Sequence, residues 1–317
     1  MGTSSETSAT AAVPWLDPYV ESTEQAVLYT LAYSDVFDYP LTAGEIWRYL
    51  IGCQVPQERV RAVLGTLAAV ETDGRFYYLS GRAAITDIRR SRADVAEQMW
   101  SRVGKYAATI AQLPFVRMVA LTGALAVVNA RANDDYDFLI VTEPGYLWLT
   151  RALVIALVVR PIALWGDEIC PNYFITSDNL AFHSRDLFTA HELTQMVPIV
   201  GQELYADLRA RNAWVHAFLP NAQGAPSQFQ HSSRTAARWL SRRLAEPLLR
   251  NNLGDRLDQW EMTRKIPQLV QEFPNPEVAL GRNQCKGHTG AHRTWVRERF
   301  AERVRRVQSV VSAPDQV

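Results

Sequence analysis

The sequence predicts an α+β protein built from three consecutive parts, at residues 21–85, 86–185 and 186–317. Three observations lead to this prediction. Apolar residues at helical spacing in the first part are followed by a short hairpin signal. Apolar strands alternate with helices in the second part, and the pattern of the third part is helical to the end of the chain.

The composition is that of a globular cytoplasmic protein. The 317 residues are 48% hydrophobic and 21% charged, which leaves room for two or three domains. The N-terminal stretch MGTSSETSATAAVP is small and polar, without the basic start and apolar run of a signal peptide, so we expect a disordered tail over residues 1–20. Three cysteines far apart in the chain favour a reducing compartment. The most apolar stretch, residues 152–164, is too short to cross a bilayer, so we expect no membrane partner.

Residues 21–85 carry the pattern of three helices and a hairpin. Thr42 can cap the second helix, and Glu45 three positions later completes a capping box. Asp73 and Gly74 mark a tight turn between two strand-forming segments. Three helices followed by a hairpin are typical of a winged helix.

Two uses of a winged helix are open. The third helix of such a module can enter the major groove of DNA, and Arg59 and Arg61 lie on that helix here. Next to Glu58 these two arginines form no basic face, which favours a packing module over DNA contact.

The charge is balanced overall but not along the chain. The whole chain has thirty-three basic and thirty-three acidic residues, yet from His231 to the end sixteen Lys and Arg stand against nine Asp and Glu. Such an excess marks either a nucleic-acid surface or, more commonly, a solvated helical surface rich in arginine.

The second part reads as a small α/β unit. A long amphipathic helix is predicted over residues 88–113, followed by a strand at 117–123. A second strand at 136–142, an apolar helix at 146–159 and a third strand at 169–176 complete the unit.

Two aspartates at the start of the second strand point to chemistry. Asp135 and Asp137 are two positions apart, so their side chains project to the same side. Carboxylates this close repel each other, and a divalent cation removes that cost. Oxygen ligands of this kind suit Mg²⁺ or Mn²⁺, which keep positions open for water and phosphates.

The first strand ends in a turn suited to phosphate. Thr122, Gly123 and Ala124 form this turn, in which glycine lets backbone amides approach a ligand closely. Ten residues separate Ala124 from Asp135. A phosphate-binding turn beside a carboxylate-held cation is the equipment of phosphoryl or nucleotidyl transfer.

This arrangement resembles the nucleotidyltransferase superfamily, typified by DNA polymerase beta and the aminoglycoside nucleotidyltransferases, whose pattern is Gly-Ser, a spacer and Asp-hydrophobic-Asp. The stretch LTGALAVVNARANDDYDFLIVTEPGYLWLTR is similar to that of bacterial proteins that join an N-terminal winged helix to such a domain. The resemblance implies transfer of an NMP group from an NTP to a hydroxyl acceptor, with release of pyrophosphate. It implies that Asp135 and Asp137 are catalytic metal ligands and that Thr122, Gly123 and Ala124 contact the triphosphate.

Two positions depart from the superfamily pattern. Ala124 replaces a serine whose hydroxyl would donate to a phosphate oxygen. The third carboxylate, usually supplied by the following strand, is missing from residues 169–176. Asn172 is the first metal-ligand candidate there, although an amide cannot accept the proton of the nucleophile. Acids at the ends of that strand are the further candidates, namely Asp167, Glu168 and Asp178.

Arginines near the motif allow two interpretations. Arg151, at the start of the next helix, is a secondary candidate for a phosphate contact, and it pairs equally well with Asp137 or Glu143. In a metal-free interpretation, Asp135 and Asp137 are bridged to Arg131 or Arg151 as a structural network. The glycine turn at the right distance favours the metal or nucleotide site.

Segments with histidine are weaker candidates. Cys285, His288 and His292 have a spacing that can bind a metal, but a fourth ligand is missing. His191 and Glu192 lack the second histidine of a zinc-protease motif, which favours a capping or core role.

The expected partners are an NTP and an acceptor, for which RNA ends, protein hydroxyls and small molecules are all used by folds of this kind. The alternative function is a catalytically degenerate nucleotide-binding or DNA-binding regulator. Ala124, the missing third acid and the winged helix favour that alternative.

Overall fold

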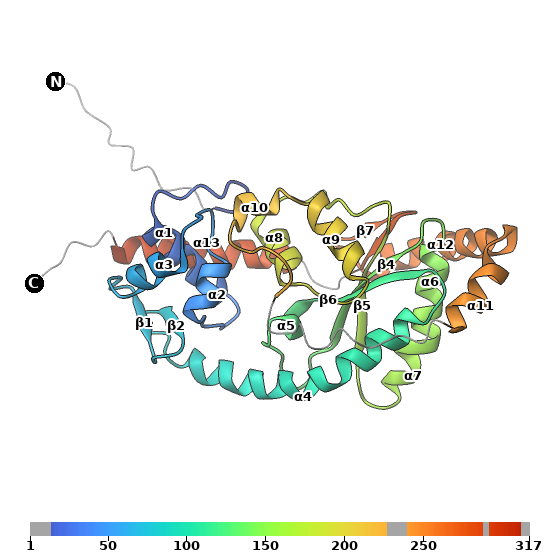
Figure 1. Ribbon diagram of the computed structural model, residues 1–317, viewed down its shortest axis with the longest axis horizontal. Helices are drawn as coiled ribbons and strands as arrows, with labels where there is room; N and C mark the ends of the chain where they lie inside the picture. Colours follow the sequence, from blue (N-terminus) through green and yellow to red (C-terminus); the bar gives the residue numbers. More distant parts are fainter. Residues whose placement is uncertain (1–13, 227–239, 288–291, 312–317) are drawn as a thin grey trace, which may run out of the picture.

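The chain is an α+β protein with a mixed sheet, as the sequence predicts, and that sheet has six strands. The computed structural model describes residues 14–226, 240–287 and 292–311. Figure 1 shows an elongated molecule with the first three helices at one end and the sheet further along. Helix α4 (Ile85–Ala111) runs along one side of the molecule, from the first three helices to the sheet. None of the described helices is long and apolar enough to span a membrane.

Three helices and a hairpin form the N-terminal unit: α1 (Thr23–Asp35), α2 (Ala43–Arg48), α3 (Gln57–Leu64), β1 (Val70–Thr72) and β2 (Tyr77–Leu79). The predicted capping box is present at α2. The Glu45 amide donates to the Thr42 hydroxyl at 3.2 Å, and the Thr42 amide donates to the Glu45 carboxylate at 2.8 Å. The antiparallel hairpin turns where the Phe76 amide donates to the Asp73 carboxylate at 2.7 Å.

The tail predicted over residues 1–20 does not hold for its last part. Residues 1–13 lie outside the described residues, but Trp15 is buried and its ring centre lies 6.5 Å from that of Phe300. The Trp15 carbonyl also accepts a hydrogen bond from the Leu187 amide at 3.0 Å. Burial of the large Trp15 side chain holds this segment in place. The polar residues before Trp15 give no indication of this contact in the sequence.

The sheet has the strand order β6-β3-β4-β5-β8-β7. Its strands are β3 (Val116–Leu121), β4 (Tyr136–Thr142), β5 (Ile169–Thr176), β6 (Val197–Val200), β7 (Ala279–Leu280) and β8 (Gln284–Lys286). β4 and β5 are parallel, and the other neighbouring pairs are antiparallel. The end of β3 therefore meets the beginnings of β4 and β5 at one edge of the sheet.

The region after residue 186 is not helical throughout, which corrects the prediction. It contains α8 (Leu187–Gln195), α9 (Gln202–Arg211), α10 (Val215–Phe218), α11 (Leu240–Leu249), α12 (Asn252–Glu272) and α13 (His292–Val311). It also contributes β6, β7 and β8, which extend the sheet on both sides. These strands are too short for alternation to reveal them. Pro198 lies in β6, which is an edge strand of the sheet, and a residue without an N–H is tolerated there.

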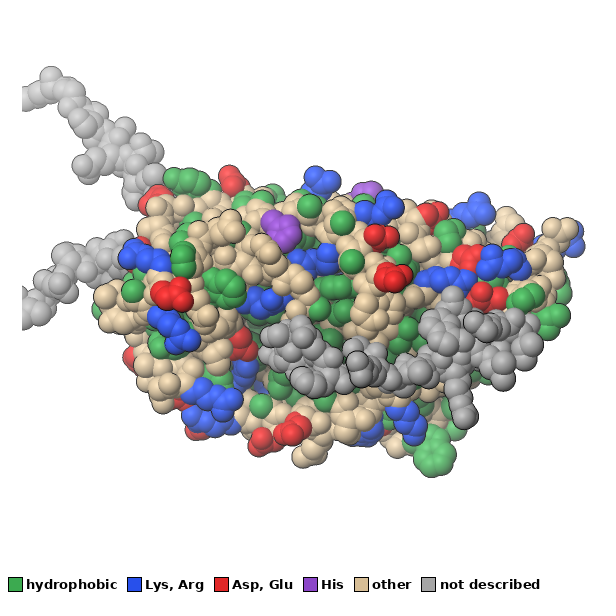
Figure 2. Space-filling view, in the orientation of Figure 1, with side chains coloured by type: hydrophobic (Ala, Val, Ile, Leu, Met, Phe, Trp, Pro, Cys, Tyr) green, Lys and Arg blue, Asp and Glu red, His purple; other side chains and the backbone are tan. Residues whose placement is uncertain are grey.

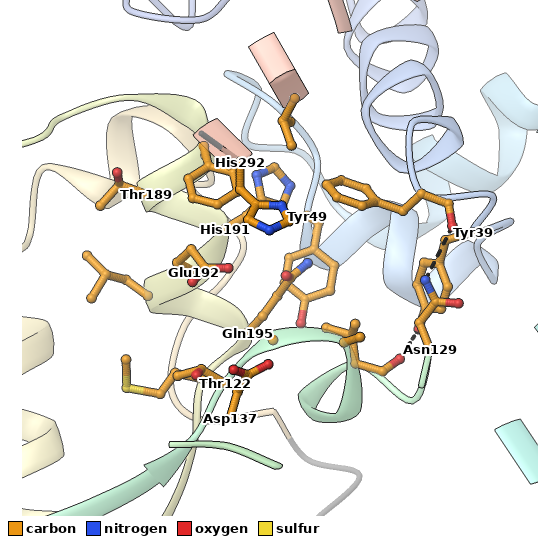
Figure 3. Close-up of a pocket in the computed structure, with 18 of the residues that line it drawn as sticks. Tyr39, Tyr49, Thr122, Asn129, Asp137, Thr189, His191, Glu192, Gln195 and His292 are labelled. Atoms are coloured by element: carbon orange, nitrogen blue, oxygen red, sulfur yellow. Dashed lines mark hydrogen bonds between the residues drawn. The ribbon is translucent and has the colours of Figure 1, made fainter. Parts of the chain in front are cut away.

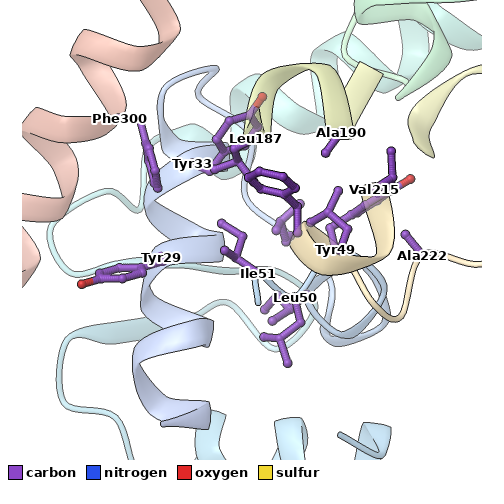
Figure 4. Packing of buried hydrophobic residues seen from close by; sticks show 14 of the residues in the cluster. Tyr29, Tyr33, Tyr49, Leu50, Ile51, Leu187, Ala190, Val215, Ala222 and Phe300 are labelled. Carbon is purple, nitrogen blue, oxygen red and sulfur yellow. The ribbon is translucent and has the colours of Figure 1, made fainter. Parts of the chain in front are cut away.

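Helices cover both faces of the sheet. One face packs against α4 and α6 (Leu147–Val154), which continues as a π-helical turn (Ile155–Val159) and α7 (Arg160–Ala163). The other face packs into a core shared with α8, the N-terminal unit and α13. Figure 4 shows this core, in which Tyr33 of α1, Leu187 and Ala190 of α8 and Phe300 of α13 lie together. The three predicted parts therefore do not have separate cores.

The basic excess after His231 does not form a separate basic face among the described contacts. Figure 2 shows Lys and Arg side chains interspersed with Asp and Glu on the face in view. Four of the eight arginines of α12 and α13 pair with acids: Arg264 with Glu261, Arg293 with Asp186, Arg299 with Glu302 and Arg303 with Asp35. These pairs support a solvated, internally paired helical surface.

Candidate functional site

A cavity of about 1230 Å³ lies at the sheet edge where β3 ends and β4 and β5 begin. Its wall combines that edge with α8, the N-terminal unit and the start of α13. Figure 3 shows Thr122 and Asp137 at the sheet edge, Glu192 on α8 nearby, and Tyr39 and Tyr49 from the N-terminal unit. The cavity is therefore enclosed by segments far apart in the sequence.

The predicted aspartates meet in this cavity. The carboxylates of Asp135 and Asp137 and the thiol of Cys170 lie within 4.8 Å of one another, the one such group of potential metal ligands among the described residues. Cys170 is opposite Asp137 in the parallel pair of β4 and β5. The side-chain amide of Asn172 donates to Asp137 Oδ1 at 3.0 Å. Asn172 thus lies beside Asp137 and contacts it as a hydrogen-bond donor, and its predicted role as a metal ligand stays a prediction.

The charge of Asp137 is crowded. Burial raises the pKa of Asp137 well above its usual range, and the charges of Asp135 and Glu192 raise it further. Hydrogen bonds from Asn172 and Cys170 oppose this effect. Carboxylates brought together in this way are stabilised by a divalent cation, so the residues present fit the predicted metal.

The chemistry of the donor set favours a hard cation. Burial raises the pKa of the Cys170 thiol, and the charges of Asp137 and Asp135 raise it further. Without an ion the thiol is therefore a hydrogen-bond donor to the carboxylates. The oxygen ligands of the two carboxylates suit Mg²⁺ or Mn²⁺.

The turn after β3 lies directly against Asp137. The Thr122 amide donates to the Asp137 carbonyl at 2.9 Å, and the short helix α5 (Gly123–Ala126) follows. Gly123 has φ +68°, and a Cβ atom there would lie 2.2 Å from Asp137 Oδ2. Glycine is required for the conformation and for the space. Thr122, Gly123 and Ala124 all line the cavity, so the structure brings the predicted phosphate turn to the aspartates.

Thr122 carries an unsatisfied polar atom at this point. Its side chain is 6% exposed, and its hydroxyl has no hydrogen-bond partner among the described atoms. A buried hydroxyl without a partner costs free energy, and ligand sites are one of the few places where such atoms persist. The Thr122 hydroxyl therefore lies buried and unpaired among the described atoms, two residues before Ala124, where the superfamily has its serine.

Arg151 is not brought to the site, which corrects its prediction as a phosphate contact. It lies on α6, on the sheet face opposite the cavity, with its guanidinium 5.9 Å from the Trp148 ring centre. Its positive charge acts on Cys285, whose thiol pKa it lowers against the stronger opposite effect of burial. The helical spacing of residues 146–159 places Arg151 on a helix but does not reveal which face of the sheet that helix covers.

None of the three acids at the ends of β5 lines the cavity. Asp167 accepts hydrogen bonds from Arg102 at 2.5 Å and from Tyr106. Glu168 is exposed, and Asp178 is exposed beyond the far end of β5. These acids have ordinary structural or solvated roles.

Glu192 is a further acid of the cavity, whereas the sequence analysis favours only a capping or core role for it. It lines the cavity from α8, as does Asp137 from β4, and its charge raises the pKa of Asp137; Figure 3 shows both side chains. Burial raises the pKa of Glu192, while the charge of Lys286 lowers it. Its carboxylate forms no hydrogen bond or ion pair with the described residues. The available signal was one acid in a helix whose other residues are mostly buried.

The segment with zinc-like spacing does not form a centre in the described part of the chain. His288 lies outside the described residues. Cys285 is buried in β8 with the core on the sheet face opposite the cavity, whereas His292 lines the cavity.

Comparison of the chain with protein-family models, curated proteins and solved structures finds no match. The resemblance to nucleotidyltransferases therefore rests on the sequence motif alone.

His191, beside Glu192, provides a prediction for pH. Its ring stacks on Tyr33 at 3.9 Å, and its Nδ1–H donates to the Leu187 carbonyl at 2.9 Å. Burial lowers the pKa of His191 from 6.5 to about 4. The unfolded chain thus takes up the proton first, so this contribution to stability is complete above pH 6.5 and is lost as the pH falls towards 4.

We expect the unfolding free energy of the wild type to fall by about 3 kcal/mol more than that of His191→Phe between pH 7 and pH 4. Urea unfolding followed by circular dichroism measures both values. Parallel loss of stability in the two proteins would show that His191 is not the group responsible.

Proposed function

We propose that the protein is a metal-dependent nucleotidyltransferase that moves an NMP group from an NTP to a hydroxyl acceptor and releases pyrophosphate. One observation carries the proposal: the glycine turn of β3 lies against Asp137 so closely that a Cβ at Gly123 would be 2.2 Å from its carboxylate. The turn and the Asp135–Asp137 pair therefore act on one ligand. In this proposal the N-terminal unit is a winged helix that walls the cavity, and residues 86–185 form the catalytic domain.

The chain's own residues have defined tasks in this reaction. Asp135 and Asp137 would hold Mg²⁺ or Mn²⁺, which when bound supplies charge neutralisation to the phosphates. The turn formed by Thr122, Gly123 and Ala124, which lines the cavity, would bind phosphate oxygens through its backbone. The cavity volume of about 1230 Å³ exceeds that of an ordinary small-ligand pocket, which leaves room for an acceptor beside the nucleotide.

Glu192 is the residue proposed to receive the acceptor's proton. As the acceptor oxygen forms its bond to the α-phosphorus, the proton moves to the Glu192 carboxylate, and the bond between the α-phosphorus and the pyrophosphate oxygen breaks. The raised pKa of Glu192 suits a general base. This role falls to α8 because Asn172 occupies the strand position of the superfamily's third acid.

The test of the proposal measures binding and turnover side by side. Each of the four NTPs is titrated calorimetrically with and without Mg²⁺. Release of pyrophosphate and transfer of label from α-labelled NTP are then followed with RNA, the protein itself and small hydroxyl compounds as acceptors. We expect Mg²⁺-dependent binding together with turnover.

The second candidate is a nucleotide-binding regulator without activity, and the amide of Asn172 in place of the third strand carboxylate favours it. Binding without pyrophosphate release would support the regulator. Absence of NTP binding would contradict both functions.

A further inference from the structure

Three arginines line the cavity together with the aspartates, namely Arg48, Arg92 and Arg131, and the last two act on each other through their charges. Arg92 is on α4, and Arg131 is in the connection between α5 and β4. The Asp134 amide donates to the Arg131 carbonyl at 3.1 Å, which closes a turn with Cα atoms of the two residues within about 7 Å. Arg131 is therefore placed close to Asp135.

Arg92 is held firmly but is only weakly paired. Its guanidinium donates to the Phe37 carbonyl at 2.8 Å and to Asn129 Oδ1 at 3.0 Å. Its side chain is 11% exposed, and its one ion pair among the described residues is a 4.0 Å contact with Asp38. Asp38 also accepts a hydrogen bond from Arg82 at 2.5 Å. Arg92 therefore has no carboxylate to itself, since Asp38 is shared with Arg82 and Asp134 acts on Arg92 through its charge without a described ion pair.

Arg131 adds a second positive charge to the same wall. Its side chain is exposed and forms no ion pair with a described carboxylate. The Asp134 carboxylate is engaged by the Arg131 backbone amide at 2.8 Å. Burial lowers the pKa of Arg92, and the charge of Arg131 lowers it further. Two cations that face one cavity are stabilised when an anion binds between them.

We propose that Arg92 and Arg131 bind the β- and γ-phosphates of the nucleotide. The identity of this ligand rests on the proposed function, whereas the position of the two arginines in the cavity does not. Guanidinium groups bind phosphate oxygens through paired, charge-assisted hydrogen bonds. Phe37 follows α1, and its carbonyl accepts a hydrogen bond from Arg92. The N-terminal unit therefore positions one of the two arginines that bind the phosphates.

Arg131→Gln is the first test, because this side chain is exposed and its removal breaks no described ion pair. Calorimetry in Mg²⁺ measures the affinity for the four NTPs, the four NMPs and inorganic tripolyphosphate. We expect affinity for NTP and tripolyphosphate to fall about tenfold and affinity for NMP to stay within about twofold. Arg61→Gln, an exposed arginine of α3 outside the cavity, is the matched control and should bind all probes as the wild type does.

The outcomes separate this inference from the proposed function. Unchanged NTP and tripolyphosphate affinity in Arg131→Gln, or an equal loss for NMP, would overturn the phosphate assignment. Turnover with normal NTP affinity in that variant would support the transferase and contradict the phosphate assignment. Selective loss of NTP affinity in a protein that never releases pyrophosphate would support the phosphate site and contradict the transferase. Arg92→Gln should repeat the selective loss, with its melting temperature as the folding control.

Discussion

Asp137→Asn is expected to reduce nucleotidyl transfer about 10³-fold while the protein stays folded. The substitution keeps the shape of the side chain and the contact with Asn172, but it removes the charge that would hold the cation. The fold binds the Asp137 proton more tightly than the unfolded chain does, because burial and the charges of Asp135 and Glu192 raise its pKa. Ionisation at neutral pH therefore costs stability when no cation is present.

That cost gives the variant a second signature besides lost activity. In chelator at pH 7, Asp137→Asn should melt at the same temperature as the wild type or higher. Added Mg²⁺ should raise the melting temperature of the wild type and leave the variant unchanged, because only a ligand that binds the folded state stabilises it. Calorimetric melting and the label-transfer assay provide both readouts.

Asp178→Asn is the matched control for this prediction. It is the same chemical change at an exposed position beyond the far end of β5, so activity and the response to Mg²⁺ should not change. Full transfer activity in Asp137→Asn would remove Asp137 from the catalytic site. A Mg²⁺ response equal to that of the wild type would show that the cation binds elsewhere.

The parts of the site that the sequence predicts are those set by local patterns. β4 and β5 form over the predicted residues because their apolar runs are bounded by turn residues. Asp135 and Asp137 share a side of the chain because the side-chain period of a strand is two residues. β3 and β4 are antiparallel neighbours, so the end of β3 lies beside the start of β4. Gly123, which follows β3, therefore lies next to the two aspartates.

The parts that the sequence does not predict are set by packing between distant segments. Glu192 reaches the cavity because β6, which follows α8, pairs with β3. Arg92 reaches it because α4 extends from the N-terminal unit along the sheet. No local period connects either residue to the aspartates, so charge and spacing alone leave them among many surface candidates.

Arg151 illustrates a different limit. A connection between parallel strands is right-handed in nearly all proteins, so α6 is confined to one face of the sheet once β4 and β5 are known to be parallel neighbours. Tyr136 and Phe138 belong to the core beneath α6, whereas Leu139 belongs to the opposite core. Asp137 alternates with the first two, so it points away from α6 and Arg151. The sheet face on which Arg151 lies is thus set by the strand order, and no local sequence pattern indicates that order.

Gly123→Ala is expected to lower transfer by about 10²-fold and to destabilise the protein by more than backbone strain alone. Strain at φ +68° costs an alanine about 1–2 kcal/mol. In addition, its Cβ would lie 2.2 Å from Asp137 Oδ2 and 3.0 Å from Asp137 Cγ, so the carboxylate has to move. Gly145→Ala is the matched control, since Gly145 has φ +84° with no atom near the added Cβ. The stability of Gly145→Ala should fall only by the cost of backbone strain, and its activity should not change.

A double-mutant cycle isolates the contact between the turn and the carboxylate. In an Asp137→Ala background the two closest atoms are gone, and the Asp137 Cβ at 3.2 Å is the contact that remains. The cost of Gly123→Ala should therefore fall to that of Gly145→Ala, with a coupling of at least about 1 kcal/mol measured by urea unfolding. Additive free energies, or wild-type Mg²⁺ affinity in Gly123→Ala, would show that the turn and Asp137 do not depend on each other. Coupling together with lost Mg²⁺ affinity would mean that the glycine is required because it lets the phosphate turn and the metal ligand occupy adjacent space.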